Sequence, residues 1–384
     1  MANTRQVAIT QDHTKLSADV TYFPWLLTEA QMPDELIGYG GAYQSSDGAC
    51  TRFYENSNQT SELAREVVSW SVESGSSAGD QLAEVWVAGS GFVLSSSSDT
   101  TIYMEYGDNA LSDYADGDTY GRNAVYDSNF VSVYHMNEDP TGSAPQLIDS
   151  TGNGWDMSAH GSGWVSGDVV SAQVGNGIDF NFGSSQYFSE TDTSALGLTD
   201  KLSVTGWANT TADTSGRLIT KHGSSYGWMV GRDATTDSIA FLLSTTGSDW
   251  NGGIATSNLW PLSTNVHIGA TYDGSNMKVF ADGTEDTSGI FPYSQTGSIN
   301  DSSQTYMISN DGFANHFGTQ WLDQISVSKV DRGSSWIAAE YANQNSPSTF
   351  ASAGTPGSIG GGGSHPIART FVGPFGSPLK GVLQ

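Results

Sequence analysis

Aromatic residues set among small polar residues are the first feature of this sequence that could do chemistry. A sugar presents apolar C–H faces and many hydroxyls, so its binding site needs an exposed aromatic ring beside polar groups. Trp250 is flanked by Ser, Asp, Asn and Gly and is hard to bury by strand alternation, although packing on a neighbouring sheet is the alternative. We therefore expect a glycan-binding site in two turn-rich runs, "YGWMVGRD" and "GSDWNGGIATSNLW", which carry Tyr226, Trp228, Asp233, Trp250, Asn251 and Trp260.

Groups that could break a bond are scarce. Hydrolysis of a glycosidic bond needs two carboxylates at a fixed separation. Glu190 and Asp192 in "SETDT" lack a third partner, and we expect them to be solvated. The chain has no Glu-x-Asp-x-x-Glu, Gly-x-Ser-x-Gly or His-Glu-x-x-His run, and its seven histidines are scattered, with His135 and His267 expected to pack within strands. These features argue against an enzyme and leave a glycoside hydrolase as a distant alternative.

Charge excludes two classes of partner. The 384 residues carry a net charge of −27, which repels nucleic acid and anionic membranes. Surface solvation is the expected role of this acidity, with a metal role as the alternative. No stretch approaches the ~20 apolar residues that span a bilayer, and "MANTRQVAIT" has no apolar run of signal-peptide length. The single Cys50 cannot form an internal disulfide.

The elements that must position these residues are short strands. Alternating runs bounded by Gly, Asn and Asp recur about every twelve residues, which is typical of β-sandwiches. The pattern predicts an all-β protein with a β-rich domain over 1–128 and a jelly roll over 129–350. "LAREVVSWSVES" fits both helix and strand. One helix is expected in "DRGSSWIAAEYANQ", capped by Ser334 or Ser335, with Trp336, Ala339 and Ala342 on one face.

A hairpin over 265–289 is the most regular local pattern. Val266, Ile268, Ala270 and Tyr272 alternate with smaller or polar residues, and Met277 begins a second alternating run. The Asp-Gly pair between the runs supplies the left-handed backbone that a tight turn needs, and a second Asp-Gly makes the next reversal. The hairpin is therefore expected to build the core and to carry no chemistry.

This hairpin, with its "ATYDGSNMKVFADG" run, resembles the late strands of concanavalin A-like, laminin G-like jelly rolls. Three further stretches resemble the same family in the same order: "VYHMNED…LIDSTGNGWD", "LSVTGWANT" and "WLDQISVSKV". Together they cover about 130–345. Residues 5–110, with "WIAAEYANQNSPSTF" near the end, resemble an uncharacterised bacterial β-rich domain that often precedes such jelly rolls. The usual Trp-x-Tyr-Arg opening of that domain is missing here.

The resemblance implies one structural calcium ion, because laminin G-like jelly rolls often bind Ca²⁺ through carboxylates and carbonyls. Asp149, Asn153 and Asp323 stand in the matching stretches and are the candidate ligands. Asp149 and Asn153 could instead cap the "DSTGNG" turn by bonding nearby N–H groups. Asp323 could equally pair with a loop amide.

The composition changes after Phe350. Residues 351–364 form a Gly/Ser-rich stretch expected to be a flexible linker, and 365–384 carry basic and apolar residues with no acidic one. Three prolines forbid a regular helix there, so an extended arm is expected, with a frayed tail as the alternative. Residues expected to anchor this arm to another subunit are Arg369, Phe371, Phe375, Leu379 and Leu383.

Two functions fit this sequence. One is a surface or virion structural protein, for example of a phage, that displays a glycan-binding jelly roll and is anchored by its C-terminal arm. The other is a freely secreted carbohydrate-binding adhesin. Both place the protein outside the cell or on a virion surface, with glycans and other protein subunits as partners.

Overall fold

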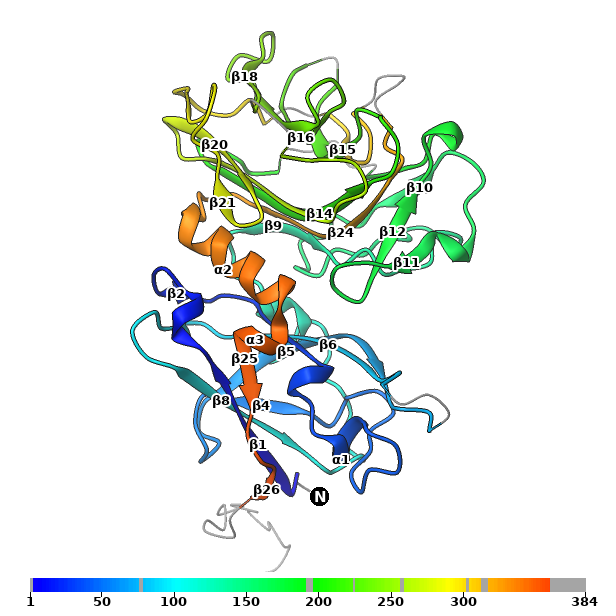
Figure 1. Ribbon diagram of the computed structural model, residues 1–384, viewed down its shortest axis with the longest axis vertical. Coiled ribbons are helices and arrows are strands. Elements are labelled where there is room, and N and C mark those ends of the chain that lie inside the picture. The colour runs from blue at the N-terminus through cyan, green and yellow to red at the C-terminus, as the bar shows by residue number, and fades with distance from the viewer. Residues whose placement is uncertain are drawn as a thin grey trace, which may run out of the picture.

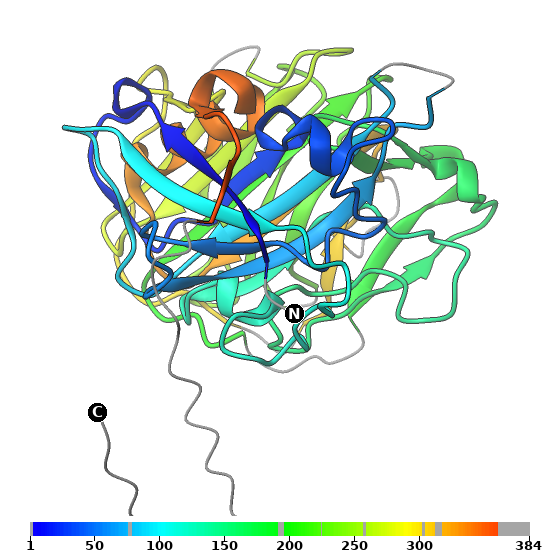
Figure 2. The ribbon, with the colours of Figure 1, turned by 90° about the horizontal axis from the view of Figure 1, so that it is seen from below.

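A computed structural model describes residues 3–75, 79–190, 196–223, 225–255, 259–301, 304–311 and 317–359. Its strands form two antiparallel domains stacked along the long axis of the molecule (Figure 1). Viewed from below, the N-terminal domain lies across the jelly roll, and the C-terminal segment runs beside the first strand (Figure 2). The predicted all-β fold class is confirmed.

The N-terminal domain combines strands from both ends of the chain. Its strands are β1 (Arg5–Gln11), β2 (Val20–Thr21), β3 (Trp25–Thr28), β4 (Arg52–Tyr54), β5 (Glu62–Ser71), β6 (Leu82–Ala88), β7 (Val93–Leu94), β8 (Thr100–Tyr106), β25 (Ala351–Ala353) and β26 (Gly357–Ser358). The main sheet has the order β25-β1-β8-β4-β5-β6-β3, with β26 also on β1, and β2 pairs β7 separately. The ambiguous "LAREVVSWSVES" run is thus a strand, with a bulge after Val67.

The jelly roll contains two packed sheets. Its strands are β9 (Phe130–Tyr134), β10 (Ser158–His160), β11 (Val169–Ser171), β12 (Asn176–Phe180), β13 (Tyr187–Glu190), β14 (Leu202–Thr210), β15 (Arg217–Lys221), β16 (Trp228–Asp233), β17 (Ser238–Leu243), β18 (Asn251–Ile254), β19 (Val266–Tyr272), β20 (Asn276–Ala281), β21 (Thr284–Glu285), β22 (Tyr293–Ser294), β23 (Tyr306–Ile308) and β24 (Gln320–Ser328). One sheet has the order β10-β13-β23-β15-β16-β17-β18. The other has the order β11-β12-β24-β14-β19-β20-β21, with β22 on β20 and β9 on β24.

The predicted hairpin is present as β19 and β20. Tyr272 pairs with Met277, and the alternating residues from Val266 to Tyr272 are buried. The Asp273 carboxylate accepts hydrogen bonds from the backbone of Ser275 and Asn276, both at 2.7 Å. Gly274 has a φ of +94°, which an L side chain rarely adopts, so this turn needs its glycine.

Helices are few in the described part of the chain. They are α1 (Asp34–Ile37), α2 (Gly333–Asn345) and α3 (Pro347–Phe350), with short 3₁₀ turns η1 (His13–Lys15), η2 (Glu29–Gln31), η3 (Arg122–Val125), η4 (Ser166–Asp168) and η5 (Phe182–Ser184). Helix α2 begins at Gly333 with Arg332 as its N-cap, so the predicted caps Ser334 and Ser335 lie inside the helix and that prediction is wrong. The helix buries Trp336 and Ala339 as expected, whereas Ala342 is half-buried. Figure 1 shows α2 lying between the two domains.

The segment expected to be a linker starts with ordered structure. Ala351–Ala353 and Gly357–Ser358 extend the N-terminal sheet by pairing with β1. These two segments pair with β1 because its side facing away from β8 otherwise has unpaired N–H and C=O groups. The chain therefore starts and finishes its described part in the same sheet.

Candidate functional site

A groove of about 310 Å³ lies on the outer face of the seven-stranded sheet, at the end of the molecule far from the N-terminal domain (Figure 1). Strand alternation builds its floor. Trp228 and Val230 of β16 point into the core, so Met229 between them points outward. In β17 the same alternation turns Ala240 and Leu242 outward.

An aromatic wall closes one end of the groove. The rings of Tyr226 and Trp250 are stacked, with centroids 4.8 Å apart and planes 12° apart. His222 meets the Trp250 ring edge-on at 4.7 Å. Both stacked rings are half-buried, so part of their surface remains open to a ligand.

Hydrogen bonds hold this wall in place. The Asn300 side chain donates to the carbonyl of Tyr226 at 2.6 Å and to the hydroxyl of Ser225 at 3.1 Å. The Tyr226 N–H donates to the carbonyl of Gly247, in the loop that leads to Trp250. The two loops that carry the stacked rings are therefore tied to each other.

Charged groups line the opposite end of the groove. The Arg217 guanidinium pairs with the buried carboxylate of Asp311 at 2.9 Å and donates to the Ser215 carbonyl at 2.9 Å. Asp233, the last residue of β16, lies at the same end. The groove thus offers a flat aromatic surface, an apolar floor, and polar donors and acceptors, the combination that suits a ligand with both apolar faces and hydroxyls.

Two predicted glycan-binding residues are placed elsewhere, and that prediction is wrong for them. Trp228 and Trp260 are both fully buried in the jelly-roll core. Trp228 is the first residue of β16, and its side chain points into the core. Tyr226 lies two residues before the strand, so the alternation of β16 does not set its direction. Asn251 is half-buried at the start of β18, next to Trp250. Of the aromatic residues predicted to bind a glycan, Tyr226 and Trp250 are therefore the two that the structure brings together as a half-buried pair.

Sequence reasoning missed several groove residues. Met229 and Leu242 lie in apolar runs, and the sequence does not show which residues of such a run face the core and which face outward. Arg217 and Asp311 are 94 residues apart and become partners only through the pairing of β15 with β23. The alternation of β16 is the one signal that could have found Met229.

The residues proposed for calcium do not fit a metal ion in this arrangement. Both Asp149 oxygens accept hydrogen bonds, from the N–H groups of Val133 and Trp155 and from Thr151. The Asn153 amide nitrogen donates to the carbonyls of residues 130 and 131. Turn capping, the alternative drawn from the sequence, thus accounts for Asp149, whereas Asn153 ties the turn to the carbonyls of strand β9 instead of accepting from nearby N–H groups.

The third calcium candidate, Asp323, is also engaged elsewhere. Its carboxylate is fully buried and accepts from the N–H of Val174 at 2.8 Å, the loop-amide role expected as an alternative. Burial raises the pKa of Asp323 well above its ordinary value. Within the described ranges, one set of three His, Asp or Glu ligand atoms lies within 4.8 Å: that of Asp12, His13 and Asp99.

Of the carboxylates considered for catalysis, Glu190 is half-buried in β13, and Asp192 lies outside the described residues. The arm residues also lie outside them: Arg369, Phe371, Phe375, Leu379 and Leu383. The described chain finishes at residue 359, next to β26 and the start of β1. Figure 1 places β26 at the end of the molecule opposite β18. None of the described helices combines the length and apolar character that a bilayer crossing requires.

Comparison with known proteins gives structural likeness only. No family model and no curated protein matches the chain. The binding domain of Paraclostridial Mosquitocidal Protein 1 is 12% identical, with a TM-score of 0.41 over 56% of this chain and 52% of that one. The botulinum neurotoxin type G receptor-binding domain is 15% identical, with a TM-score of 0.41 over 56% and 52%. This chain thus spans about half the length of both.

Domain 4 of AbnA, a GH43 extracellular arabinanase from Geobacillus stearothermophilus, is also similar. Its structure in complex with arabinotriose is 15% identical, with a TM-score of 0.43 over 56% of this chain and 98% of that one. Identities and TM-scores this low support no conclusion about the activity of this chain. Its function must be argued from its own groove and its own termini.

Proposed function

We propose that this chain is a non-enzymatic surface or virion structural protein whose jelly roll binds carbohydrate in the groove between Tyr226, Trp250 and Arg217. The stacked pair of half-buried rings carries this proposal. Such a pair is a flat surface on which the C–H face of a sugar ring can rest, and Asp233 and Arg217 at the opposite end of the same groove can face its hydroxyls.

The position of the groove supports a display role. The groove lies at one end of a long two-domain body, and residue 359, to which the predicted arm is joined, lies at the other (Figure 1). An anchor at the arm would leave the groove facing away from the assembly. A free adhesin would have no need of this separation, and it is the second candidate function.

A binding role fits the carboxylates of the groove better than hydrolysis does. A glycosidase needs one carboxyl group kept protonated as a general acid. Asp311 instead forms a buried ion pair with the Arg217 guanidinium at 2.9 Å. One oxygen of Asp233 accepts hydrogen bonds from the N–H groups of Thr235 and Thr236, so this side chain caps the turn that follows it.

A glycan array with the purified chain tests the groove. Trp250→Ala should weaken binding to any positive glycan by roughly tenfold or more, about 1.4 kcal/mol per factor of ten. Tyr39→Ala is the control, because Tyr39 is 71% exposed on the N-terminal domain and far from the groove. Equal binding by the Trp250 variant, or a blank array, would contradict the glycan role. Deleting 365–384 tests the anchor separately, because it should abolish incorporation into the assembly while leaving glycan binding intact.

A further inference from the structure

The domain junction encloses ionisable side chains that the proposed function does not use. His135, just after β9 of the jelly roll, lies between two carboxylates of the N-terminal domain. Its Nε2 is 3.0 Å from Glu66 of β5, and its Nδ1 is 3.5 Å from Glu84 of β6. The three side chains are only 5%, 7% and 1% exposed, so the cluster is shielded from solvent.

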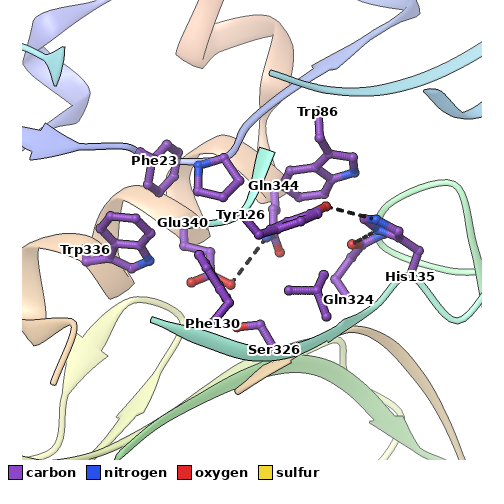
Figure 3. A pocket seen from close by; sticks show the side chains of 12 residues that line it. Phe23, Trp86, Tyr126, Phe130, His135, Gln324, Ser326, Trp336, Glu340 and Gln344 are labelled. Atoms are coloured by element: carbon purple, nitrogen blue, oxygen red, sulfur yellow. Dashed lines mark hydrogen bonds between the residues drawn. The ribbon is translucent and has the colours of Figure 1, made fainter. Parts of the chain in front are cut away.

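Hydrogen-bond partners surround both nitrogens of this imidazole, among them the Tyr126 hydroxyl, which lies 3.1 Å from Nε2 (Figure 3) and donates to Glu66 at 2.7 Å. Gln324 donates through Nε2 to Glu84 at 2.8 Å, and this fixes its Oε1 as the atom that faces His135 Nδ1, also at 2.8 Å. Glu66 accepts at the other nitrogen and also from Ser150 at 2.8 Å. With the Tyr126 hydroxyl donating to Glu66, an imidazolium donates through Nδ1 to Gln324 and through Nε2 to Glu66.

We propose that protonated His135 is a latch that holds the two domains in register, and that loss of its proton loosens the junction while both domains stay folded. The physical reason is charge balance. Glu66 and Glu84 both belong to the N-terminal domain and face the jelly roll at the junction. Without the imidazolium between them, two largely buried carboxylates have no cation beside them, which raises the free energy of the closed junction.

Among the residues that the structure describes, no other cation near the cluster can take over this role. Arg65 of β5 pairs with Asp113, and Arg122 of η3 pairs with Asp116. The remaining ionisable neighbours are acids or a phenol and cannot supply a positive charge: Tyr126, Glu138, Asp323 and Glu340.

Two cavities meet at the latch. A small cavity of about 30 Å³ lies on one side. Its lining includes His135, Tyr126, Trp86 and Gln324 together with side chains of α2 (Figure 3). On the other side, a polar cleft of about 280 Å³ between the domains is lined by Glu66, His135 and other polar residues. This cleft gives water and hydroxide a route to the imidazole, so its proton can exchange with solvent.

The direction of the pH effect follows from the surroundings. Burial by itself would lower the pKa of His135, but Glu66 and Glu84 raise it to about 9. Burial raises the pKa of Glu84 to about 7. The pKa values of His135 and Glu84 are both higher in the closed junction than in water, so the closed junction binds more protons than the open one. The stabilisation by His135 is complete below a pH of about 6.5 and is lost as the pH rises through about 9.

The size of the effect follows from the same shift. Each unit of pKa difference between the closed and open junction changes their equilibrium tenfold. A rise from about 6.5 to about 9 therefore corresponds to a roughly 300-fold shift toward the open junction in alkaline solution.

Hydrogen exchange of the full chain between about pH 6 and about pH 10.5 tests the latch, with rates corrected for their intrinsic pH dependence. Wild type should lose protection in β5, β6 and β9 progressively as the pH rises from about 6.5 to about 9, while the seven-stranded sheet stays protected. Glu66→Gln with Glu84→Gln should keep the junction closed over the whole range, because no cation is then needed. His135→Gln should open it already at the acidic end.

The control is His160→Gln, a half-exposed histidine in β10 that bonds Ser189 within the jelly roll and should follow wild type. Wild type that stays protected at the alkaline end overturns the latch. So does a double glutamine variant that opens at the same pH as wild type. If His135→Gln fails to fold, wild type against the double variant still decides the question.

Discussion

Asn343 in helix α2 provides the sharpest test of how the C-terminal segment supports the N-terminal domain. Leu26 lies in β3, the outermost strand of its sheet, and its N–H and C=O bond a side chain of α2 on the unpaired side of the strand. The Asn343 side chain accepts from the Leu26 N–H at 2.8 Å and donates to the Leu26 C=O at 3.0 Å. Both residues are 1% exposed, so one amide replaces a missing neighbouring strand in a dry environment.

Asn343→Ala should therefore leave two buried backbone groups without partners. An unsatisfied buried donor or acceptor costs about 1–3 kcal/mol, so we expect a loss of about 2–4 kcal/mol in the free energy of unfolding of the N-terminal domain. Urea unfolding measures this loss as a shift of the midpoint at unchanged slope.

Asn345→Ala is the matched control, because Asn345 is the exposed last residue of the same helix and should change stability by less than about 0.5 kcal/mol. A loss below about 0.5 kcal/mol for Asn343→Ala would refute the reasoning, since it would mean that water reaches Leu26 and replaces the amide. An equal loss in both variants would also refute it, because the effect would then come from helix propensity.

Two further expectations concern the junction and the core. Arg332 forms two hydrogen bonds of 2.8 Å to Asp127 and, against the opposing effect of burial, lowers the pKa of that carboxyl. The stabilisation by this ion pair should be complete above the ordinary carboxyl pKa of about 3.9 and lost as the pH falls through the lowered pKa of Asp127. In Asp127→Asn, urea midpoints measured across the acidic range should no longer show this loss of stability at low pH. Trp228→Ala should cost about 3–5 kcal/mol of stability by leaving a core cavity, yet Trp228→Phe should bind any glycan ligand with unchanged affinity, because Trp228 does not reach the groove. Urea titrations and the glycan array check these two outcomes, and selective loss of binding in Trp228→Phe would contradict the inward placement.

The existence of most strands could be predicted from the sequence because alternation is a local property. The hairpin of β19 and β20 is the clearest case, since Asp273-Gly274 sets the turn and the turn sets the register. Helix α2 was predicted for a similar reason, and it begins within two residues of the expected caps. The candidate site was predicted in part: Tyr226 and Trp250 were named, whereas their stacking and their charged companions were not.

Aromatic residues show why the rest could not be predicted. Trp228 and Trp250 are both tryptophans in Gly-rich and polar surroundings, yet one is fully buried and the other half-buried. Their difference depends on which face of β16 is covered and on where the loop before β18 turns, and both depend on the packing of two sheets. His135 is a similar case, because its carboxylate partners are 69 and 51 residues away in the sequence.

By itself, the sequence determined a turn-rich, acidic, all-β chain with a jelly roll, since strand period, turn residues and net charge are each set by the residues nearby. Only the tertiary structure decided that residues 351–353 complete the sheet of residues 5–11, that Asn343 closes the edge of β3, and that one imidazole stands between two carboxylates of another domain. The physical reason is that these contacts join groups that are far apart along the chain. Their free energy depends on burial and on charge partners that exist only when both domains have packed together.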